Sequence, residues 1–138
     1  MSSDTPVVGA LSLESSCLRL RPDCSVESIP VDANFWPRLM SGQLGNFHNE
    51  YLVSCFSYDK DWSTWEMHPN GDEVVCLLSG AVTLVLEDAG SLRELRLDAG
   101  NSYVIVPRGT WHTARVGQPS RMLFITPGEG TQNRPVAP

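Results

Sequence analysis

Short apolar runs separated by turn-forming residues dominate the chain from residue 51 onward. The runs end at clusters such as Pro69-Asn70-Gly71-Asp72 and Asp98-Ala99-Gly100, which favour turns. The pattern predicts eight strands, over residues 51–58, 62–68, 74–78, 81–87, 92–97, 103–106, 112–116 and 122–126. A spacing of about 8–12 residues between strands is typical of an all-β sandwich or barrel. No apolar helical period of useful length competes with this pattern.

The ends of the chain differ from its centre. Residues 1–44 are mixed in character, with one short apolar run at 18–20, and we expect an N-terminal arm that holds an edge strand or a short helix. Residues 45–127 are expected to form the barrel. Residues 128–138 are polar and rich in glycine and proline at their start, so we expect a C-terminal tail.

The composition of the chain indicates what kind of protein it is and which partners are excluded. A chain of 138 residues fits one domain with a real core, and 41% apolar with 19% charged residues is usual for soluble globular proteins. The net charge of −6 argues against nucleic acid and against an anionic membrane as partners. No segment approaches the roughly 20 apolar residues needed to cross a bilayer, and the N-terminus lacks the basic region of a signal peptide.

The four cysteines (Cys17, Cys24, Cys55 and Cys76) follow neither a disulfide framework nor a zinc-site spacing. Cys55 and Cys76 lie within apolar runs, so we expect them to be buried free thiols. Free thiols are typical of a reducing compartment, and the cytoplasm is the expected location.

Four side chains that commonly bind metal ions lie in two short segments: Glu66, His68, Glu73 and His112. Side chains alternate along a strand, so Glu66 and His68 are expected to project to the same face. The turn after His68 lets Glu73 return to that face on the next strand, and His112 follows a second turn. A mixture of carboxylates and imidazoles suits Fe(II), Mn(II), Ni(II), Zn(II) or Co(II).

At these residues the chain resembles the cupin superfamily. The first motif of that family runs His-x-His, three or four residues, Glu, six residues, Gly, and here His68, Glu73 and Gly80 match it. The second centres on Pro-x-Gly-x-x-His, matched by Pro107-Arg108-Gly109-Thr110-Trp111-His112. The resemblance covers about residues 45–127. It implies a double-stranded β-helix, or jelly-roll barrel, with a metal ion held inside one end.

The chain also departs from the family pattern. Glu66 stands at the first histidine, Lys60 at an earlier glycine, and Val116 at an asparagine beyond the second motif. Carried over residue by residue, the resemblance makes His68, Glu73 and His112 the metal ligands. Glu66 is expected either as a fourth ligand or as a general base, and its repulsion from Glu73 favours a cation between them. In the alternative reading, the barrel is metal-free and the motif glycines and prolines serve its turns.

The resemblance implies a small metal-binding cupin that acts on a small organic molecule. With Fe(II) it would be a dioxygenase; with Mn(II), Ni(II) or Zn(II) it would be an isomerase or lyase that uses Lewis acidity and Glu66 as base. The alternatives are a non-catalytic module that binds or senses a small molecule or a metal, and a metal-free structural barrel. A homodimer is expected in each case.

Other candidates for the site are weaker. They are His48 at the mouth of the barrel, Trp62 as a pocket wall, Tyr58 and Arg121 as substrate contacts, and Trp65 and Trp111. Trp65 and Trp111 each adjoin a proposed ligand in sequence, so alternation predicts that both face away from the metal.

Overall fold

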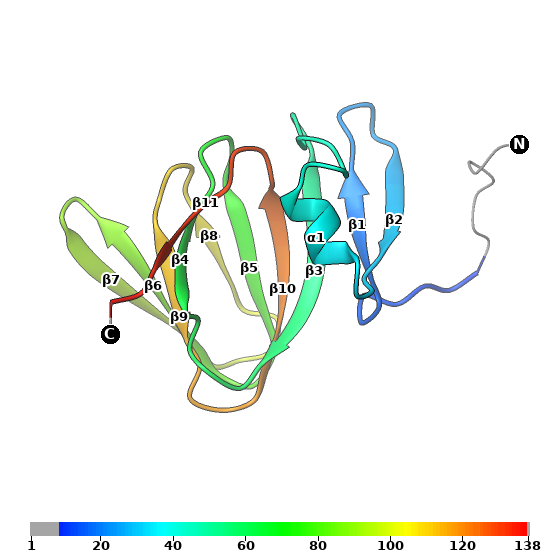
Figure 1. Ribbon diagram of the computed structural model, residues 1–138. Coiled ribbons are helices and arrows are strands. Elements are labelled where there is room, and N and C mark those ends of the chain that lie inside the picture. Colours follow the sequence, from blue (N-terminus) through cyan, green and yellow to red (C-terminus); the bar gives the residue numbers. More distant parts are fainter. Residues whose placement is uncertain (1–8, 138) are drawn as a thin grey trace, which may run out of the picture.

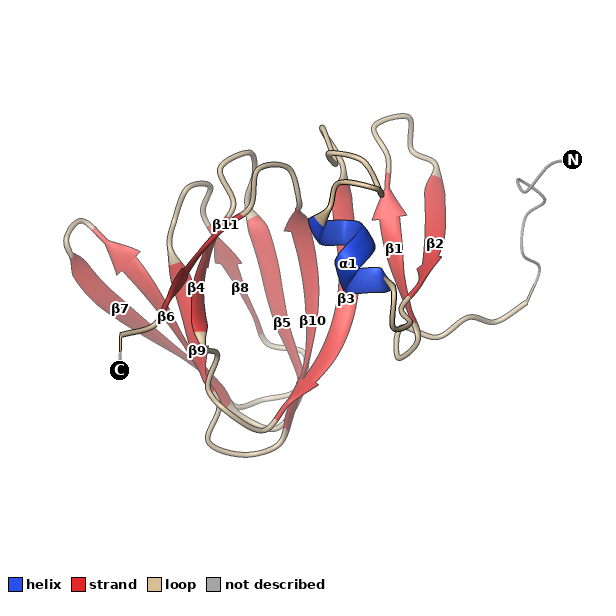
Figure 2. Ribbon diagram, viewed as in Figure 1, coloured by secondary structure: helices blue, strands red, loops and turns tan. Residues whose placement is uncertain are grey.

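The computed structural model describes residues 9–137 and is almost entirely β (Figure 2). The strands are β1 (Ser16–Leu20), β2 (Val26–Pro30), β3 (Tyr51–Tyr58), β4 (Thr64–Met67), β5 (Glu73–Ser79), β6 (Val82–Asp88), β7 (Ser91–Leu97), β8 (Tyr103–Val106), β9 (His112–Arg115), β10 (Ser120–Pro127) and β11 (Gln132–Pro135). The helix α1 spans Phe35–Met40. All eight strands predicted from the apolar runs are present, with small shifts at their ends.

The strands form two antiparallel sheets (Figure 1). One sheet has the order β2-β1-β3-β10-β5-β8 and the other has the order β11-β4-β9-β6-β7. From β3 to β11 the chain passes from one sheet to the other at every connection except the one between β6 and β7, which belong to the same sheet. This repeated crossing is the jelly-roll arrangement, so the predicted all-β double-stranded β-helix is confirmed.

The main core lies between the sheets because alternate side chains of each strand turn inward. On β5, Val75 and Leu77 are fully buried, while Val74 and Cys76 point to the outer face and stay partly exposed. All four cysteines are free thiols, as expected. The prediction that Cys55 is buried is confirmed, but the same prediction for Cys76 is wrong, since an apolar run does not reveal which of its faces is outside.

The outer face of the six-stranded sheet carries two rows of apolar side chains that lie opposite one another on neighbouring strands. One row contains Ile105, Val74, Ile125 and Val53, and the other contains Tyr103, Cys76, Leu123 and Cys55. Tyr103 and Ile105 are the most exposed of them, at 62% and 56%. We call these two rows the outer apolar face.

The first 44 residues contribute two strands and the helix. β1 pairs with β3 and with β2, which forms the edge of the sheet. Phe35 of α1 is fully buried against Cys17 and Ile29, which fixes the helix to this sheet.

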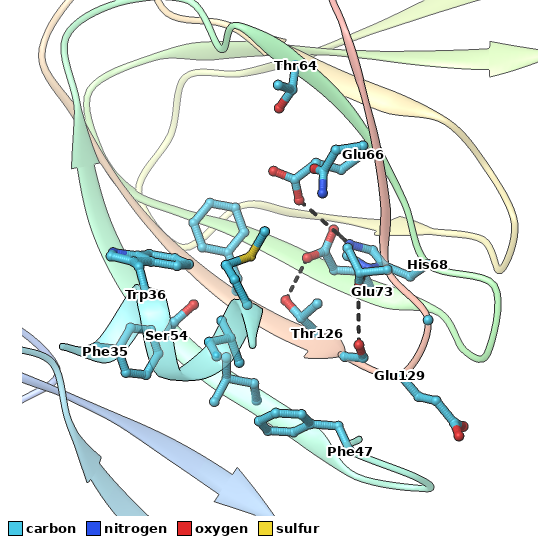
Figure 3. Close-up of a pocket in the computed structure, with 18 of the residues that line it drawn as sticks. Phe35, Trp36, Phe47, Ser54, Thr64, Glu66, His68, Glu73, Thr126 and Glu129 are labelled. Atoms are coloured by element: carbon cyan, nitrogen blue, oxygen red, sulfur yellow. Dashed lines mark hydrogen bonds and ion pairs between the residues drawn. The ribbon is translucent and has the colours of Figure 1, made fainter. Parts of the chain in front are cut away.

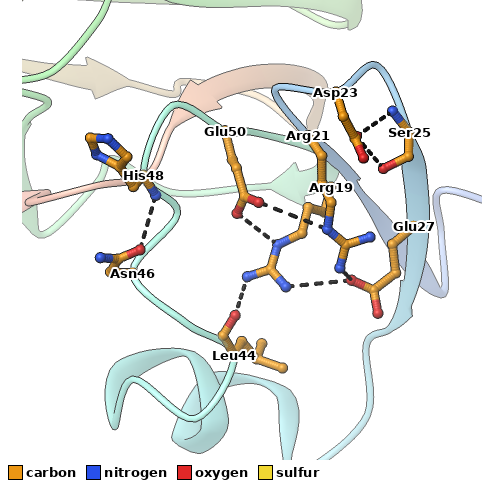
Figure 4. Close-up of polar contacts among 9 residues, drawn as sticks. All are labelled: Arg19, Arg21, Asp23, Ser25, Glu27, Leu44, Asn46, His48 and Glu50. Carbon is orange, nitrogen blue, oxygen red and sulfur yellow. Dashed lines mark hydrogen bonds and ion pairs between the residues drawn. The ribbon is translucent and has the colours of Figure 1, made fainter.

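The arginine of β1 secures the loop that follows α1 (Figure 4). Arg19 forms ion pairs with Glu27 and Glu50, donates a hydrogen bond to the carbonyl of Leu44, and stacks on the ring of Phe47 at 4.2 Å. The loop over residues 41–50 is therefore tied to the sheet.

The C-terminal segment returns to the barrel. β11 lies within the expected tail and pairs with β4, with Arg134 opposite Trp65. The Arg134 guanidinium lies 5.4 Å from the ring of Trp65 and 4.4 Å from that of Trp111, and contacts Glu87. The described residues contain no helix long and apolar enough to cross a membrane.

Candidate metal centre

The two sequence motifs meet between the two sheets. Glu66 lies on β4 and His68 follows that strand directly, while Glu73 begins β5 and His112 begins β9. Glu66 and His112 are directly opposite each other on paired strands. The turn over residues 69–72 brings Glu73 back toward His68 from the other sheet, as the alternation predicted.

The four side chains lie close together, and Figure 3 shows three of them, Glu66, His68 and Glu73, pointing toward one another. Oε1 of Glu73 lies 2.9 Å from Nε2 of His112 and 3.4 Å from Nε2 of His68. Oε1 of Glu66 lies 3.8 Å from Nε2 of His68. One potential ligand atom from each of Glu66, His68 and His112 lies within 4.8 Å of the others. This spacing is that of groups able to share one ion.

Each of the three buried residues has one polar atom held by the protein. Nδ1 of His68 bonds the hydroxyl of Thr131 at 2.9 Å, and Nδ1 of His112 donates to the carbonyl of Thr110 at 3.1 Å. The Thr126 hydroxyl donates to Oε2 of Glu73 at 2.7 Å. Such partners fix the orientation of ligand side chains in metal sites.

The second polar atom of each residue is left without a hydrogen bond. Nε2 of His68, Nε2 of His112 and Oε1 of Glu73 are buried and have no hydrogen-bond partner, although Oε1 of Glu73 lies near both nitrogens. Buried polar atoms are rarely left so, since each unpaired atom costs about 1–3 kcal/mol. A bound cation would satisfy all three atoms at once, so the residues fit a metal ion.

The carboxylates and imidazoles influence one another strongly. Burial would raise the pKa of Glu73, but its contacts with His112 and His68 outweigh burial and lower that pKa to about 2. Burial would lower the pKa of His112, and the contact with Glu73 raises it instead. Burial and the nearby Glu73 raise the pKa of Glu66. Glu73 is therefore ionised, and positive charge beside its carboxylate would be stabilising.

A cavity of about 770 Å³ opens beside the four residues and includes Glu66, His68 and Glu73 in its wall. Its far side is formed by α1 and the loop after it, where Trp36 is 49% exposed. The Glu66 side chain is 32% exposed, against 3% for Glu73. Glu66 is thus the carboxylate that a molecule in the cavity would meet first.

The aromatic candidates divide as predicted. Trp62 and Tyr58 line the cavity, with ring centroids 5.7 Å apart. Trp65 and Trp111 face away from the proposed metal position and stack on Arg134 instead.

The remaining polar candidates lie outside the cavity wall. His48 has an exposed side chain and hydrogen-bonds Glu129, which does line the cavity, at 3.0 Å. Arg121 turns to the outer side of its sheet, where it contacts Cys55 and Glu14. The expectation that Arg121 contacts a substrate is therefore not met by its position.

Sequence reasoning missed the residues that hold the ligands and those that build the far wall. Thr126 occupies an inward position of a predicted strand, so the alternation could have indicated it. Thr131 lies in the segment expected as a tail, and nothing local pointed to it. Phe35 and Trp36 reach the cavity only through the packing of α1.

No protein-family model matches this chain, and no curated protein matches it in sequence. Among solved structures, an oxalate oxidase matches with a TM-score of 0.50 at 15% identity, over 59% of this chain and 44% of that one. A cupin-2 domain protein from Shewanella frigidimarina matches at 0.49 and 19% identity, over 58% and 72%. Hydroquinone 1,2-dioxygenase from a Sphingomonas species matches at 0.47 and 16% identity, over 55% of this chain and 58% of that one.

This chain spans less than two thirds of the oxalate oxidase and of the hydroquinone dioxygenase. At these identities the similarity concerns the fold. Together with the two-sheet topology, the match to the oxalate oxidase confirms the fold that the two motifs implied: the chain has the double-stranded β-helix fold of the cupins.

Proposed function

We propose that this chain is a metal-dependent enzyme that acts on a small organic molecule, with His68, Glu73 and His112 as metal ligands. One observation carries the proposal: three buried and unpaired polar atoms converge at the wall of a cavity large enough for a metabolite. A ligand set of two imidazoles and one carboxylate suits Fe(II), Mn(II), Ni(II) or Zn(II).

A divalent ion in this site would supply Lewis acidity or, in the case of Fe(II), the capacity to activate oxygen. The protein's own residues prepare the site for it. Thr131, Thr110 and Thr126 orient the ligands, and the Glu66 carboxylate faces the cavity, where it can accept a proton from a bound molecule or join the ligands. The first role belongs to an isomerase or lyase. A dioxygenase needs only the other three residues.

Elemental analysis of protein purified without chelator, and after reconstitution with each of the four ions, tests the proposal. About one metal ion per chain is expected, with loss of binding in His68→Ala and in His112→Ala. The matched control is His48→Ala, because His48 is exposed and lies outside the cavity wall. Fewer than about 0.2 ions per chain after reconstitution would overturn the metal site.

The variant Glu66→Gln separates the two roles of that residue. Loss of metal would identify a ligand, whereas retained metal with loss of turnover would identify a general base. Oxygen uptake with thiols, catechols and diketones as substrates tests the dioxygenase branch.

A second candidate function is binding or sensing without turnover. The observation in its favour is the apolar far wall, where α1 contributes Phe35, Trp36, Leu39 and Met40 to the cavity, because such side chains bind a molecule but do no chemistry. Saturable binding with no conversion of any ligand, in protein loaded with metal, would support this candidate over the enzyme.

We further propose that the chain forms a homodimer in the cytoplasm. The outer apolar face supports the dimer, because contiguous exposed apolar surface is unusual on a monomer. The four free thiols support a reducing compartment.

A further inference from the structure

The cavity wall beside the proposed ligands is rich in aromatic rings. Those from α1, β3, β10 and the loop before β4 include Phe35, Trp36, Phe56, Tyr58, Trp62 and Phe124. Near the mouth, the ring of Trp36 lies 5.1 Å from that of Phe35 and 5.5 Å from that of Phe56. Toward the ligands, the ring of Trp62 lies 5.8 Å from that of Phe124 and 6.3 Å from that of His112. Aromatic faces and edges therefore run from the mouth to the metal position.

The same wall offers no fixed positive charge to an anion. Among residues 9–137, no lysine or arginine lines the cavity, while three glutamates do: Glu66, Glu73 and Glu129. A divalent cation would balance the charges of Glu66 and Glu73, and Glu129 is hydrogen-bonded to His48. A carboxylate brought into this space would lose its water without gaining a charged partner, apart from the metal itself.

The arginine beside the cavity is already occupied. Arg19 stacks on Phe47, which lines the cavity, but the guanidinium itself is taken by Glu27, Glu50 and a backbone carbonyl (Figure 4). It does not face the space that a ligand would fill.

We propose that the cavity takes an aromatic molecule and discriminates against molecules that carry a carboxylate. The volume of about 770 Å³ holds one such molecule, and Ser54, Thr64, Thr126 and Asn133 give its hydroxyl or carbonyl groups hydrogen-bond partners. This rests on the proposed function in so far as the molecule would lie against the metal, but the aromatic wall selects its ligand whether or not the metal is bound.

Calorimetric titration with two compounds that share one ring system tests this. 1-Naphthalenemethanol is uncharged, and 1-naphthoate carries a carboxylate. The alcohol is expected to bind at least about tenfold more tightly than the carboxylate in protein treated with chelator, where no metal ion can coordinate the carboxylate. Binding of the carboxylate as tight as that of the alcohol would overturn the assignment.

Substitutions on the cavity wall and outside it locate the binding. Trp36→Ala is expected to weaken binding of the alcohol about tenfold, while Trp36→Phe keeps a ring and most of the affinity. Leu92→Ala, which removes an exposed apolar side chain outside the cavity and on the other sheet, is the control and leaves the affinity unchanged. Glu66→Gln is expected to narrow the difference between alcohol and carboxylate, because one lining carboxylate becomes neutral. Equal affinities in Trp36→Ala and wild type would place the ligand elsewhere and refute the proposal.

The two proposals fail in different ways. Protein that binds no metal but still prefers the alcohol refutes the metal-dependent function and supports the aromatic wall. Protein that binds one metal ion but shows no saturable binding of the alcohol refutes the aromatic wall and leaves the metal site intact.

Discussion

His68, Glu73 and His112 each have one polar atom that is hydrogen-bonded within the protein and one that faces the proposed metal position. In His68, one ring nitrogen bonds Thr131 and the other faces the shared point with Glu73 and His112. A histidine without its outer partner is free to rotate, so the hydroxyl of Thr131 limits the freedom of the ligand. The hydrogen-bond partner of each proposed ligand therefore helps to determine how tightly the site would bind a metal ion.

Thr131→Ala is expected to weaken metal affinity about tenfold, because His68 loses the hydrogen bond that orients it. Competition with a chromophoric chelator measures this affinity. Thr131→Ser retains the hydroxyl and serves as the control. Equal affinity in Thr131→Ala and wild type would show that Thr131 does not position His68.

Thiol reactivity offers a second test at this scale. Cys17 is 1% exposed, and burial raises the pKa of its thiol to about 11, whereas Cys24 is exposed. Alkylation requires the thiolate, so at pH 8 iodoacetamide is expected to modify Cys24 more than about 100-fold faster than Cys17. Peptide mass spectrometry over time measures both rates, and unfolded protein, where the two rates converge, is the control. Similar rates in the folded protein would contradict the burial of Cys17.

The proximity of His68 and Glu73 could be predicted from the sequence because it depends on local geometry, whereas His112, which reaches the site through the pairing of β9 with β4, was placed there by the resemblance of the second motif. Strand alternation and the turn over residues 69–72 place His68 near Glu73 whatever the rest of the chain does. The partner Thr131 could not be predicted, since it reaches His68 only through the pairing of β11 with β4. Trp36 likewise depends on how α1 packs, which no short-range pattern encodes.

At the scale of elements, the turns carry sharp steric requirements. Gly80 joins β5 to β6 with a φ of +88°, and a Cβ there would lie 2.3 Å from Oγ of Ser120 and 2.6 Å from the carbonyl of Pro119. The backbone at Pro119 and at Ser120, the first residue of β10, thus lies against this glycine. The glycine that ends the first motif is required by the packing of strands, independently of any metal.

Gly80→Ala is expected to lower the free energy of unfolding by about 3 kcal/mol, since it adds a collision to the unfavourable φ. Gly90→Ala is the matched control: its φ is +85°, but nothing lies within 4 Å of the added Cβ, so the expected loss is about 1 kcal/mol. Urea denaturation measures both. Equal losses in the two variants would contradict the close contact at Gly80.

At the scale of the whole molecule, the two sheets have different outer surfaces. The six-stranded sheet presents the outer apolar face, while β7 of the other sheet carries alternating charges with Leu92 among them. A second copy of the chain seated on the apolar face would bury both rows of side chains, as in homodimer interfaces.

Sedimentation equilibrium is expected to give a mass twice the 15.2 kDa of one chain. Ile105→Arg is expected to shift the protein toward the monomer, because it places a charge in the interface. Leu92→Arg is the control, since Leu92 is 55% exposed against 56% for Ile105 but lies on the other sheet. A monomeric wild type, or a dimer unaffected by Ile105→Arg, would exclude this face as the interface.

β11 makes the site depend on the order in which the chain is synthesised. Residues 128–135 carry Thr131, which holds His68, and Asn133, which lines the cavity. Synthesis runs from the N-terminus, so they leave the ribosome after His68, Glu73 and His112 have already emerged. An ion that binds during translation would therefore meet side chains that Thr131 has not yet oriented. Selection among ions by the geometry of the site requires residues 128–135 to be in place.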